Sequence, residues 1–160
     1  AEHVYATGHE SLLSYPIYTT VLKMSAPLQA IPSSYATLFP VTEKTVERWR
    51  DLYNRKMAHV DNAAFMSEKD AHEMLKRGDG YFVHVDGTLL GIGMASDNQI
   101  KCIASVAPGG GKEVLCTLVH ALMDDTVTLE VASTNHKAIA LYESLGFTCV
   151  SQSTTWHKIV

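Results

Sequence analysis

The sequence predicts a mixed α/β fold, in which an antiparallel meander precedes a parallel crossover, on three observations. Segments with the two-residue period of strands alternate with segments that have the period of helices. Three strands follow one another through two-residue turns, which is typical of an antiparallel meander. A glycine-rich break then joins a strand to a helix and a further strand, which predicts a parallel crossover. At 160 residues, the chain is long enough for one domain with its own core.

The first elements of this fold are a strand at 35–39 and two helices. Thr42 begins the first helix, whose apolar residues recur at helical spacing and are Val46, Trp49, Tyr53 and Met57. Ser67 and Asp70 have the spacing of a capping box and begin the second helix, which Gly78 ends. Each helix therefore carries a start signal in its own sequence.

The meander is predicted from two short turns. Asp86-Gly87 separates a strand at 81–85 from one at 88–95, and this dipeptide is a strong hairpin signal. Asp97-Asn98 makes the second turn, into a strand at 100–106. Because both connections are tight, the three strands are expected to be neighbours that run antiparallel.

The later elements follow a break at 107–111 that contains three consecutive glycines. The expected order is a helix around 114–123, a strand at 126–132, a helix that Asn135 begins and Gly146 ends, and a final hairpin of strands at 147–151 and 154–159. A strand, a loop, a helix and a strand in this order predict the crossover that makes the sheet mixed.

The composition excludes several classes of protein. Apolar residues make up 46% and charged residues 19%, which argues against disorder, and the net charge of −4 makes nucleic acid an unexpected partner. Apolar runs stay short of the ~18 residues of a membrane span, so no membrane contact is expected. The cysteines, which are Cys102, Cys116 and Cys149, have no paired spacing. A reduced protein of the cytoplasm fits them best.

Metal binding is not expected either, although the chain has eight histidines. His9-Glu10 and His72-Glu73 each start like a zinc-binding helix motif. The second histidine of that motif is missing, because Leu13 and Lys76 stand at its position.

The glycine loop is the first candidate site. Pro108 to Lys112 lie between a strand and the first turn of a helix, where backbone N–H groups have no partner inside the helix and the helix dipole is positive. Glycines would let this backbone approach a pyrophosphate closely. The alternative is a flexible connector that binds nothing.

The helix that follows Asn135 is the second candidate site. Asn135 is a good helix cap, and Tyr142, seven residues later, lies on the same face of the helix two turns away. A purely structural interpretation is available, in which Tyr142 is a core aromatic and Asn135 only a cap. Periodicity alone favours that interpretation.

The same segment resembles the carboxyl-terminal motif of the GNAT superfamily of N-acetyltransferases. The pattern is Asn135-x-x-Ala138-x-x-x-Tyr142-x-x-x-Gly146-Phe147 after a strand. Upstream, Val106-x-Pro108 with the glycine loop is similar to the coenzyme A pyrophosphate loop of that superfamily. The resemblance implies a GNAT-like acyl-CoA N-acyltransferase fold whose central strands, at 100–106 and 126–132, splay apart around the pantetheine arm of acetyl-CoA.

The resemblance also implies roles for individual residues. Tyr142 would act as the general acid at the thioester sulfur, since a phenol can protonate a departing thiolate. The cofactor-binding residues would be Ser105, Val106, Gly109, Gly110, Gly111, Lys112, Glu113, Val114, Asn135 and Tyr142. The reaction implied is transfer of an acetyl group from acetyl-CoA to a primary amine of a small molecule or peptide, and a catalytically inactive CoA-binding sensor or scaffold on the same fold is the alternative.

The loop departs from the family pattern, and this affects the site. Gly110 stands where the family has Arg or Gln, and Glu113 stands where it has a second glycine. A carboxylate next to a pyrophosphate is unfavourable unless it turns away. The family's glutamate base is also missing, since Cys102 or Ile103 occupies its position. Candidate replacements for the base are Glu130, His84 or a chain of waters.

The amine acceptor is not identified by the sequence. From their location, the residues that would contact it are Tyr53, His59, Asp61, Asn62 and His84. A homodimer is expected for this kind of protein.

Two parts of the chain are distinguished, residues 1–30 as an N-terminal extension and residues 31–160 as the acetyltransferase-like domain. The extension is expected to add a strand at 17–24, and its short similarities to 143–145 and 154–159 suggest the remnant of a preceding repeat. An unrelated edge strand or dimer arm is the alternative.

Overall fold

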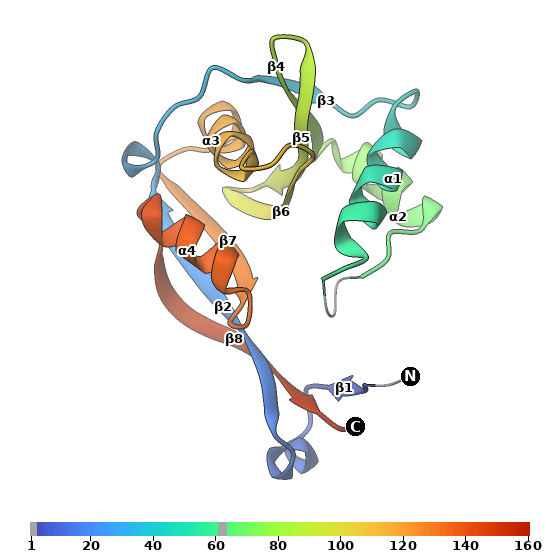
Figure 1. Ribbon diagram of the computed structural model, residues 1–160, viewed down its shortest axis with the longest axis vertical. Coiled ribbons are helices and arrows are strands. Elements are labelled where there is room, and N and C mark those ends of the chain that lie inside the picture. The colour runs from blue at the N-terminus through green and yellow to red at the C-terminus, as the bar shows by residue number, and fades with distance from the viewer. Residues whose placement is uncertain (1–2, 61–63) are drawn as a thin grey trace. The chain divides into compact units, whose positions relative to one another are not determined.

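The computed structural model describes residues 3–60 and 64–160, which form two compact units (Figure 1). The meander unit comprises Pro32–Asp124. The ribbon unit comprises Ala1–Ile31 together with Asp125–Val160, so it brings the two ends of the chain into one body.

The sheet of the meander unit has four strands, which are β3 (Thr37–Pro40), β4 (Gly80–Val85), β5 (Thr88–Ser96) and β6 (Gln99–Ser105). They are ordered β6-β5-β4-β3, and each pair is antiparallel. The turn residues Asp86, Gly87, Asp97 and Asn98 have φ of 50°, 78°, 53° and 59°. These left-handed pairs match the twist of the strands, and the predicted meander is confirmed.

Two helices cover one face of this sheet, α1 (Val46–Met57) and α2 (Glu68–Arg77). The capping box is present, because Asp70 N–H donates to Ser67 Oγ and Ser67 N–H donates to an Asp70 carboxylate oxygen, both at 3.1 Å. Gly78 ends α2 with φ of 70°. The core between helices and sheet consists of Val41, Val46, Trp49, Met66, Ala71, Met74, Phe82, Ile92 and Ala104.

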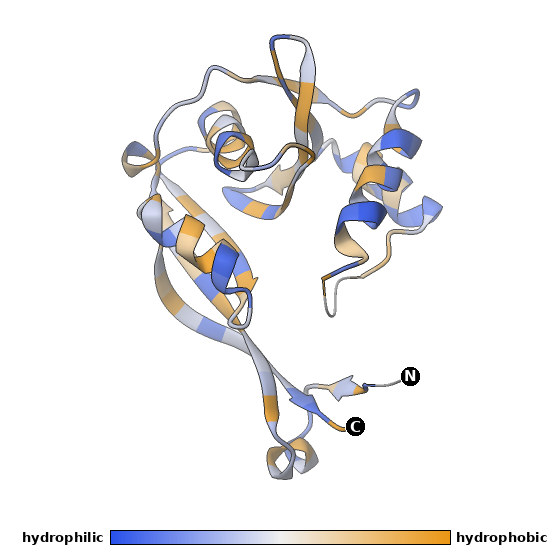
Figure 2. Cartoon of the chain, viewed as in Figure 1, coloured by the Kyte–Doolittle hydropathy of each residue, from blue (hydrophilic) through white to orange (hydrophobic). Residues whose placement is uncertain are grey.

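The opposite face of the sheet holds α3 (Gly111–Leu122), whose residues Val114 to Val119 are all buried. Figure 2 shows hydrophilic and hydrophobic residues alternating along α1 and α2. α3 approaches β5 closely at Gly91, where an added Cβ would lie 2.6 Å from Val114 Cγ2 and 2.5 Å from the Ala104 carbonyl oxygen. This contact fixes the start of α3 against the sheet.

A buried carboxylate joins the end of α2 to the sheet. Asp79 is 2% exposed, and its Oδ2 accepts from Lys101 Nζ at 2.9 Å and from Arg77 Nε at 3.2 Å. Both cations are partly exposed, so they neutralise the carboxylate without being buried themselves.

The ribbon unit has strand order β1-β8-β2-β7, with all pairs antiparallel. Its elements are β1 (Tyr5–Ala6), the short 3-10 helix η1 (Glu10–Ser14), β2 (Ile17–Pro27), a second 3-10 helix η2 (Leu28–Ala30), β7 (Thr126–Ala132), α4 (His136–Ser144) and β8 (Thr148–Lys158). β2 is the long central strand, because it pairs with β7 on one side and β8 on the other.

The predicted hairpin at 147–151 and 154–159 is wrong, since one strand, β8, runs through the whole segment. Between Cys149 and Thr154 its register against β2 shifts twice, in the manner of β-bulges, where a turn was expected. The physical reason is the length of β2, the strand with which β8 pairs. β2 is eleven residues long and offers hydrogen bonds along its length, so β8 does not need to fold back on itself.

The N-terminal extension does contribute a strand, because residues 17–24 lie within β2. Its origin as a remnant of a preceding repeat stays a prediction. None of the helices in the described ranges has the length and hydropathy of a membrane span.

Substitution Gly91→Ala should destabilise the protein by about 1–3 kcal/mol, because the new Cβ would collide with a backbone oxygen that cannot move aside. Urea unfolding followed by circular dichroism measures this. Thr88→Ala, at an exposed position of the same strand, is the control and should change stability by no more than about 0.5 kcal/mol. Equal effects of the two substitutions would show that the approach of α3 is looser than described.

Candidate active site

The glycine loop leads into the first turn of α3. Gly109 has φ of 74°, and an added Cβ there would meet no atom within 4 Å, so the loop is open on that side. Gly110 N–H donates to the Ala107 carbonyl at 3.1 Å, which closes a turn just before the helix. The next three N–H groups, of Gly111, Lys112 and Glu113, belong to the helix N-terminus and have no acceptor inside the helix. The arrangement presents donors and a positive dipole end to an anion.

The strand that precedes the loop holds it in position. Ser105 Oγ donates to the Ala107 carbonyl across the turn, and Val106 N–H donates to the Leu90 carbonyl at 2.9 Å. The N–H of Val106 is therefore used within the meander unit. Of the two strand-end residues predicted to bind the cofactor, Ser105 and Val106, the latter therefore has only its backbone carbonyl to offer.

Glu113, the unexpected acid of the loop, is turned onto a partner. Its Oε2 accepts from Ser34 Oγ at 2.5 Å, and Ser34 lies on the segment that leads into β3. Its backbone carbonyl accepts from Thr117 Oγ1 at 2.7 Å. The carboxylate of Glu113 is thus held toward Ser34. The backbone N–H of Glu113 remains one of the donors at the N-terminus of α3. The sequence carries no signal for this pairing, because 79 residues separate the two.

Cys102, one of the two residues predicted at the position of the family's base, cannot act as one. Burial raises the pKa of its thiol to about 12, with the nearby negative charge of Asp79 acting in the same direction. The side chain packs against the core under α1 and α2. A thiol with this pKa stays protonated at neutral pH and cannot accept a proton from an ammonium group.

In the ribbon unit, Asn135 and Tyr142 lie at the two ends of α4. Asn135 caps the helix, since its Oδ1 accepts from Ala138 N–H at 3.2 Å. Tyr142 is 9% exposed, and its ring lies 5.8 Å from the ring of Phe147 at an angle of 58°. The structural roles of a cap and a core aromatic are therefore both present, and any role at a cofactor would be additional to them.

The predicted acceptor residues do not form one group. Tyr53 lies on α1, stacked on Trp49 at 5.6 Å, and burial raises the pKa of its phenol. His59 is exposed just beyond α1. Asp61 and Asn62 lie outside the described residues. His84 is on β4 and lines a cavity that does not include Tyr53.

Glu130, a second candidate for the base, is exposed on β7 opposite Lys23 of β2. Within the described part of the chain, no three His, Cys, Asp or Glu side chains lie close enough together to hold a metal ion.

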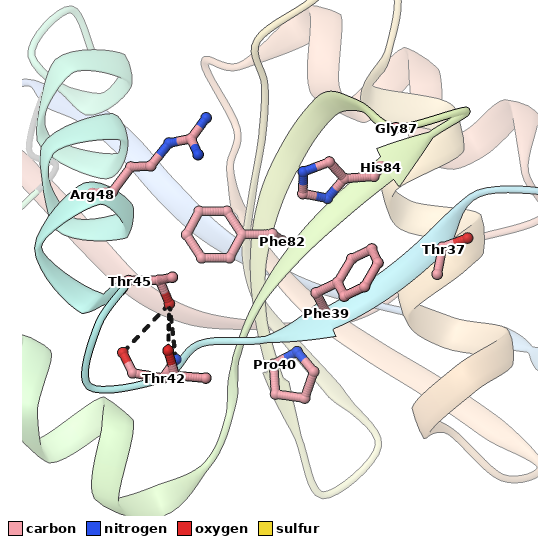
Figure 3. Close-up of a pocket in the computed structure, with 9 residues that line it drawn as sticks. All are labelled: Thr37, Phe39, Pro40, Thr42, Thr45, Arg48, Phe82, His84 and Gly87. Atoms are coloured by element: carbon pink, nitrogen blue, oxygen red, sulfur yellow. Dashed lines mark hydrogen bonds between the residues drawn. The ribbon is translucent and has the colours of Figure 1, made fainter.

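A cavity of about 510 Å³ opens on the meander unit beside β3 (Figure 3). Its lining residues are Thr37, Phe39, Pro40, Thr42, Thr45, Arg48, Phe82, His84 and Gly87. Sequence reasoning found only His84 of these. The signal that could have found more is register, because Thr37 pairs with His84 and Phe39 with Phe82, which places all four on one face.

Comparison with known proteins places the fold. No protein-family model matches the chain, and no curated protein matches it either. Solved structures do match. A putative acetyltransferase of the GNAT family from Novosphingobium aromaticivorans is 18% identical with a TM-score of 0.57, covering 99% of this chain and 74% of that one. A GCN5-related N-acetyltransferase from Anabaena variabilis is 12% identical with a TM-score of 0.62, covering 96% and 44%.

A third match is AAC(6')-Iy in complex with a bisubstrate analogue that contains CoA, at 16% identity and a TM-score of 0.50, covering 75% of this chain and 95% of that one. Identities this low establish the fold and no more. The chain has the mixed α/β fold of the GNAT N-acetyltransferases, as the sequence motif predicted. It spans less than half the length of the Anabaena protein and about three quarters of the Novosphingobium protein.

The rates at which the thiols react at pH 8 test the environment of Cys102. With a pKa of about 12, Cys102 is a thiolate in only about one molecule in 10⁴, so it should react with DTNB at least about 100-fold more slowly than the exposed Cys149. Mass spectrometry of the labelled peptides assigns each phase. Cys149→Ser, as the control, should remove the fast phase, and a fast phase that persists and maps to Cys102 would contradict the burial of that thiol.

Proposed function

We propose that the chain is an N-acetyltransferase that takes an acetyl group from acetyl-CoA and passes it to a primary amine of a small molecule or peptide. The fold is shared with several acetyltransferases, one of them in complex with a CoA-containing analogue. The observation that carries the proposal is the loop before α3, whose open left-handed glycine and three helix-end N–H groups suit a pyrophosphate.

The residues of the loop fit this group in two further respects. An added Cβ at Gly109 would enter open space, so the backbone there is accessible to a ligand. The one carboxylate of the loop, on Glu113, is engaged by Ser34. The N–H groups of Gly111, Lys112 and Glu113 would take the phosphate oxygens, and the exposed Lys112 ammonium would add a positive charge.

When bound, acetyl-CoA supplies a thioester whose carbonyl carbon is open to attack by a neutral amine. In the ribbon unit, Tyr142 would donate its phenolic proton to the departing sulfur, since the pKa values of phenols and thiols lie close enough for this transfer. Asn135 would contact the cofactor through its side-chain amide nitrogen, because its Oδ1 already caps α4. Ser105 and Val106 would contribute backbone groups from the end of β6.

The acceptor amine must lose a proton, and no side chain is assigned to that step. The thiol of Cys102 stays protonated at neutral pH and is unsuitable, and His84 lines the cavity beside β3, which leaves Glu130 or solvent. Three free thiols suit a reducing compartment, and we place the protein in the cytoplasm on that ground.

Cofactor binding is tested first, by calorimetric titration of the protein with acetyl-CoA beside 3′-dephospho-CoA. Saturable binding of acetyl-CoA supports the loop assignment. Absence of binding at millimolar concentration would overturn the proposed function.

Tyr142→Phe separates an enzyme from a module that only binds CoA. In an enzyme, kcat for thiol release in the presence of a panel of amines should fall by about 10²–10⁴-fold, while acetyl-CoA affinity stays within about twofold, because only the proton donor is lost. Ring packing on Phe147 is retained in this variant. Binding with no turnover for any amine in the unsubstituted protein would favour the catalytically inactive module instead.

Glu113→Gln should raise acetyl-CoA affinity by about two- to fivefold, since it removes a negative charge near the pyrophosphate and keeps an acceptor for Ser34. Calorimetry measures the change, and Glu73→Gln on the exposed face of α2 is the charge-matched control, with no change expected. A loss of affinity in Glu113→Gln would instead mean that the charged Glu113–Ser34 contact is needed to shape the loop.

A further inference from the structure

The cavity beside β3 has two chemically different sides. β3 and β4 form one side, and the first turn of α1, with the residues just before it, forms the other (Figure 3). It lies on the α1 and α2 face of the sheet, because Phe82 belongs to the core beneath those helices. The glycine loop and α3 belong to the opposite face. The cavity is therefore separate from the proposed pyrophosphate site within the same unit.

The strand side of the cavity is aromatic. Phe39 and His84 meet edge to face, with centroids 5.1 Å apart and an interplanar angle of 87°. Phe82 lies next to them, 6.4 Å from His84. Phe39 is 48% exposed, so its ring presents apolar surface at the cavity. An apolar, flat ligand would cover it.

The helix side is electropositive. Arg48 has its guanidinium carbon 6.0 Å from the centre of the Phe82 ring, and it forms no ion pair with any described residue. Thr42, Thr45 and Arg48 are spaced three apart at the start of α1, so the positive end of the helix dipole faces the same space. The lining contains no Asp or Glu, although the chain as a whole carries a net charge of −4.

His84 adds a directed donor. Its Nδ1 is buried and has no hydrogen-bond partner among the described residues. Nε2 is not among the buried side-chain atoms that lack a partner. A buried ring nitrogen without a partner is better left as a lone pair than as an N–H that has no acceptor. The proton of the neutral ring therefore belongs on Nε2. In Figure 3 one ring nitrogen points to the side of the cavity on which Arg48 lies.

We propose that this cavity is a binding site for a small aromatic carboxylate. The flat ring of the ligand would lie against Phe39 and Phe82, and its carboxylate would accept from Arg48 and from His84 Nε2–H. A charged acceptor with two donors gives stronger hydrogen bonds than a neutral one. An ammonium ligand is disfavoured by the same Arg48, so this site differs in charge preference from one that receives an amine. The inference does not depend on acetyl-CoA binding.

Three probes of nearly the same shape test the charge preference. Phenylacetate is an anion, phenylacetamide is neutral and 2-phenylethylamine is a cation. Titration of each into ¹⁵N-labelled protein, followed by amide shifts of β3, β4 and α1, should show phenylacetate binding at least about fivefold more tightly than the amide, with the amine weakest. Equal affinity of the three probes, or shifts confined to other elements, would overturn the proposal.

Substitutions on α1 identify the cation. Arg48→Gln should weaken phenylacetate binding by about fivefold or more and leave phenylacetamide binding within about twofold. Arg55→Gln is the matched control, because Arg55 lies two turns further along the same helix face, is exposed and does not line the cavity. Equal weakening by both substitutions would mean that general charge, and not this site, attracts the anion.

The histidine gives a readout that a nonspecific cavity would not. Long-range ¹H–¹⁵N correlation should show the His84 ring as the Nε2–H tautomer, with the Nε2 shift moving on addition of phenylacetate but not of phenylacetamide. A proton on Nδ1 would contradict the assigned donor. Phenylacetate binding should also be unchanged by saturating acetyl-CoA, and competition between the two would overturn the separation of the sites.

Discussion

The close approach of α3 to β5 is the constraint on which the candidate cofactor loop depends. At Gly91 the space for a side chain is already filled by the Ala104 carbonyl oxygen and by Val114, the fourth residue of α3. Because the helix lies this near to the sheet, the short loop at 106–110 is enough to join β6 to its first turn, whose N–H groups follow that loop. A bulkier residue at position 91 would move the helix start, and with it the anion-binding geometry.

The unusual loop sequence is compatible with this constraint. Glu113 lies in the first turn of α3, where the helix dipole stabilises a carboxylate. The same carboxylate would repel a bound phosphate. The contact with Ser34 satisfies the side chain on the meander unit itself. The backbone donors of the turn are thereby kept apart from the charge of the side chain, and the departure from the family pattern does not by itself remove the anion site.

Local signals predicted the local structure well. Asp86-Gly87 and Asp97-Asn98 specified the meander because these residues tolerate left-handed backbone, and Ser67 with Asp70 specified the start of α2. Features that depend on residues far apart in the chain could not be predicted from local sequence signals. The continuity of β8 requires the long strand β2, which lies at the other end of the chain, and a turn interpretation of its polar residues was the better local choice.

The candidate sites divide in the same way. The loop and α4 could be found because their residues are adjacent in sequence and resemble a family motif. The aromatic cavity could not be found, because it requires the register of β3 against β4 and the placement of Arg48 from α1. The net charge of the chain also does not predict the charge of the ligand that each candidate site would hold. The chain is acidic overall, yet the loop and the cavity, on opposite faces of one sheet, each combine a helix N-terminus with a basic side chain, an arrangement that favours anionic ligands. The local field of helix ends and a few cations, and not the sum of charges, decides which ligands each site can hold.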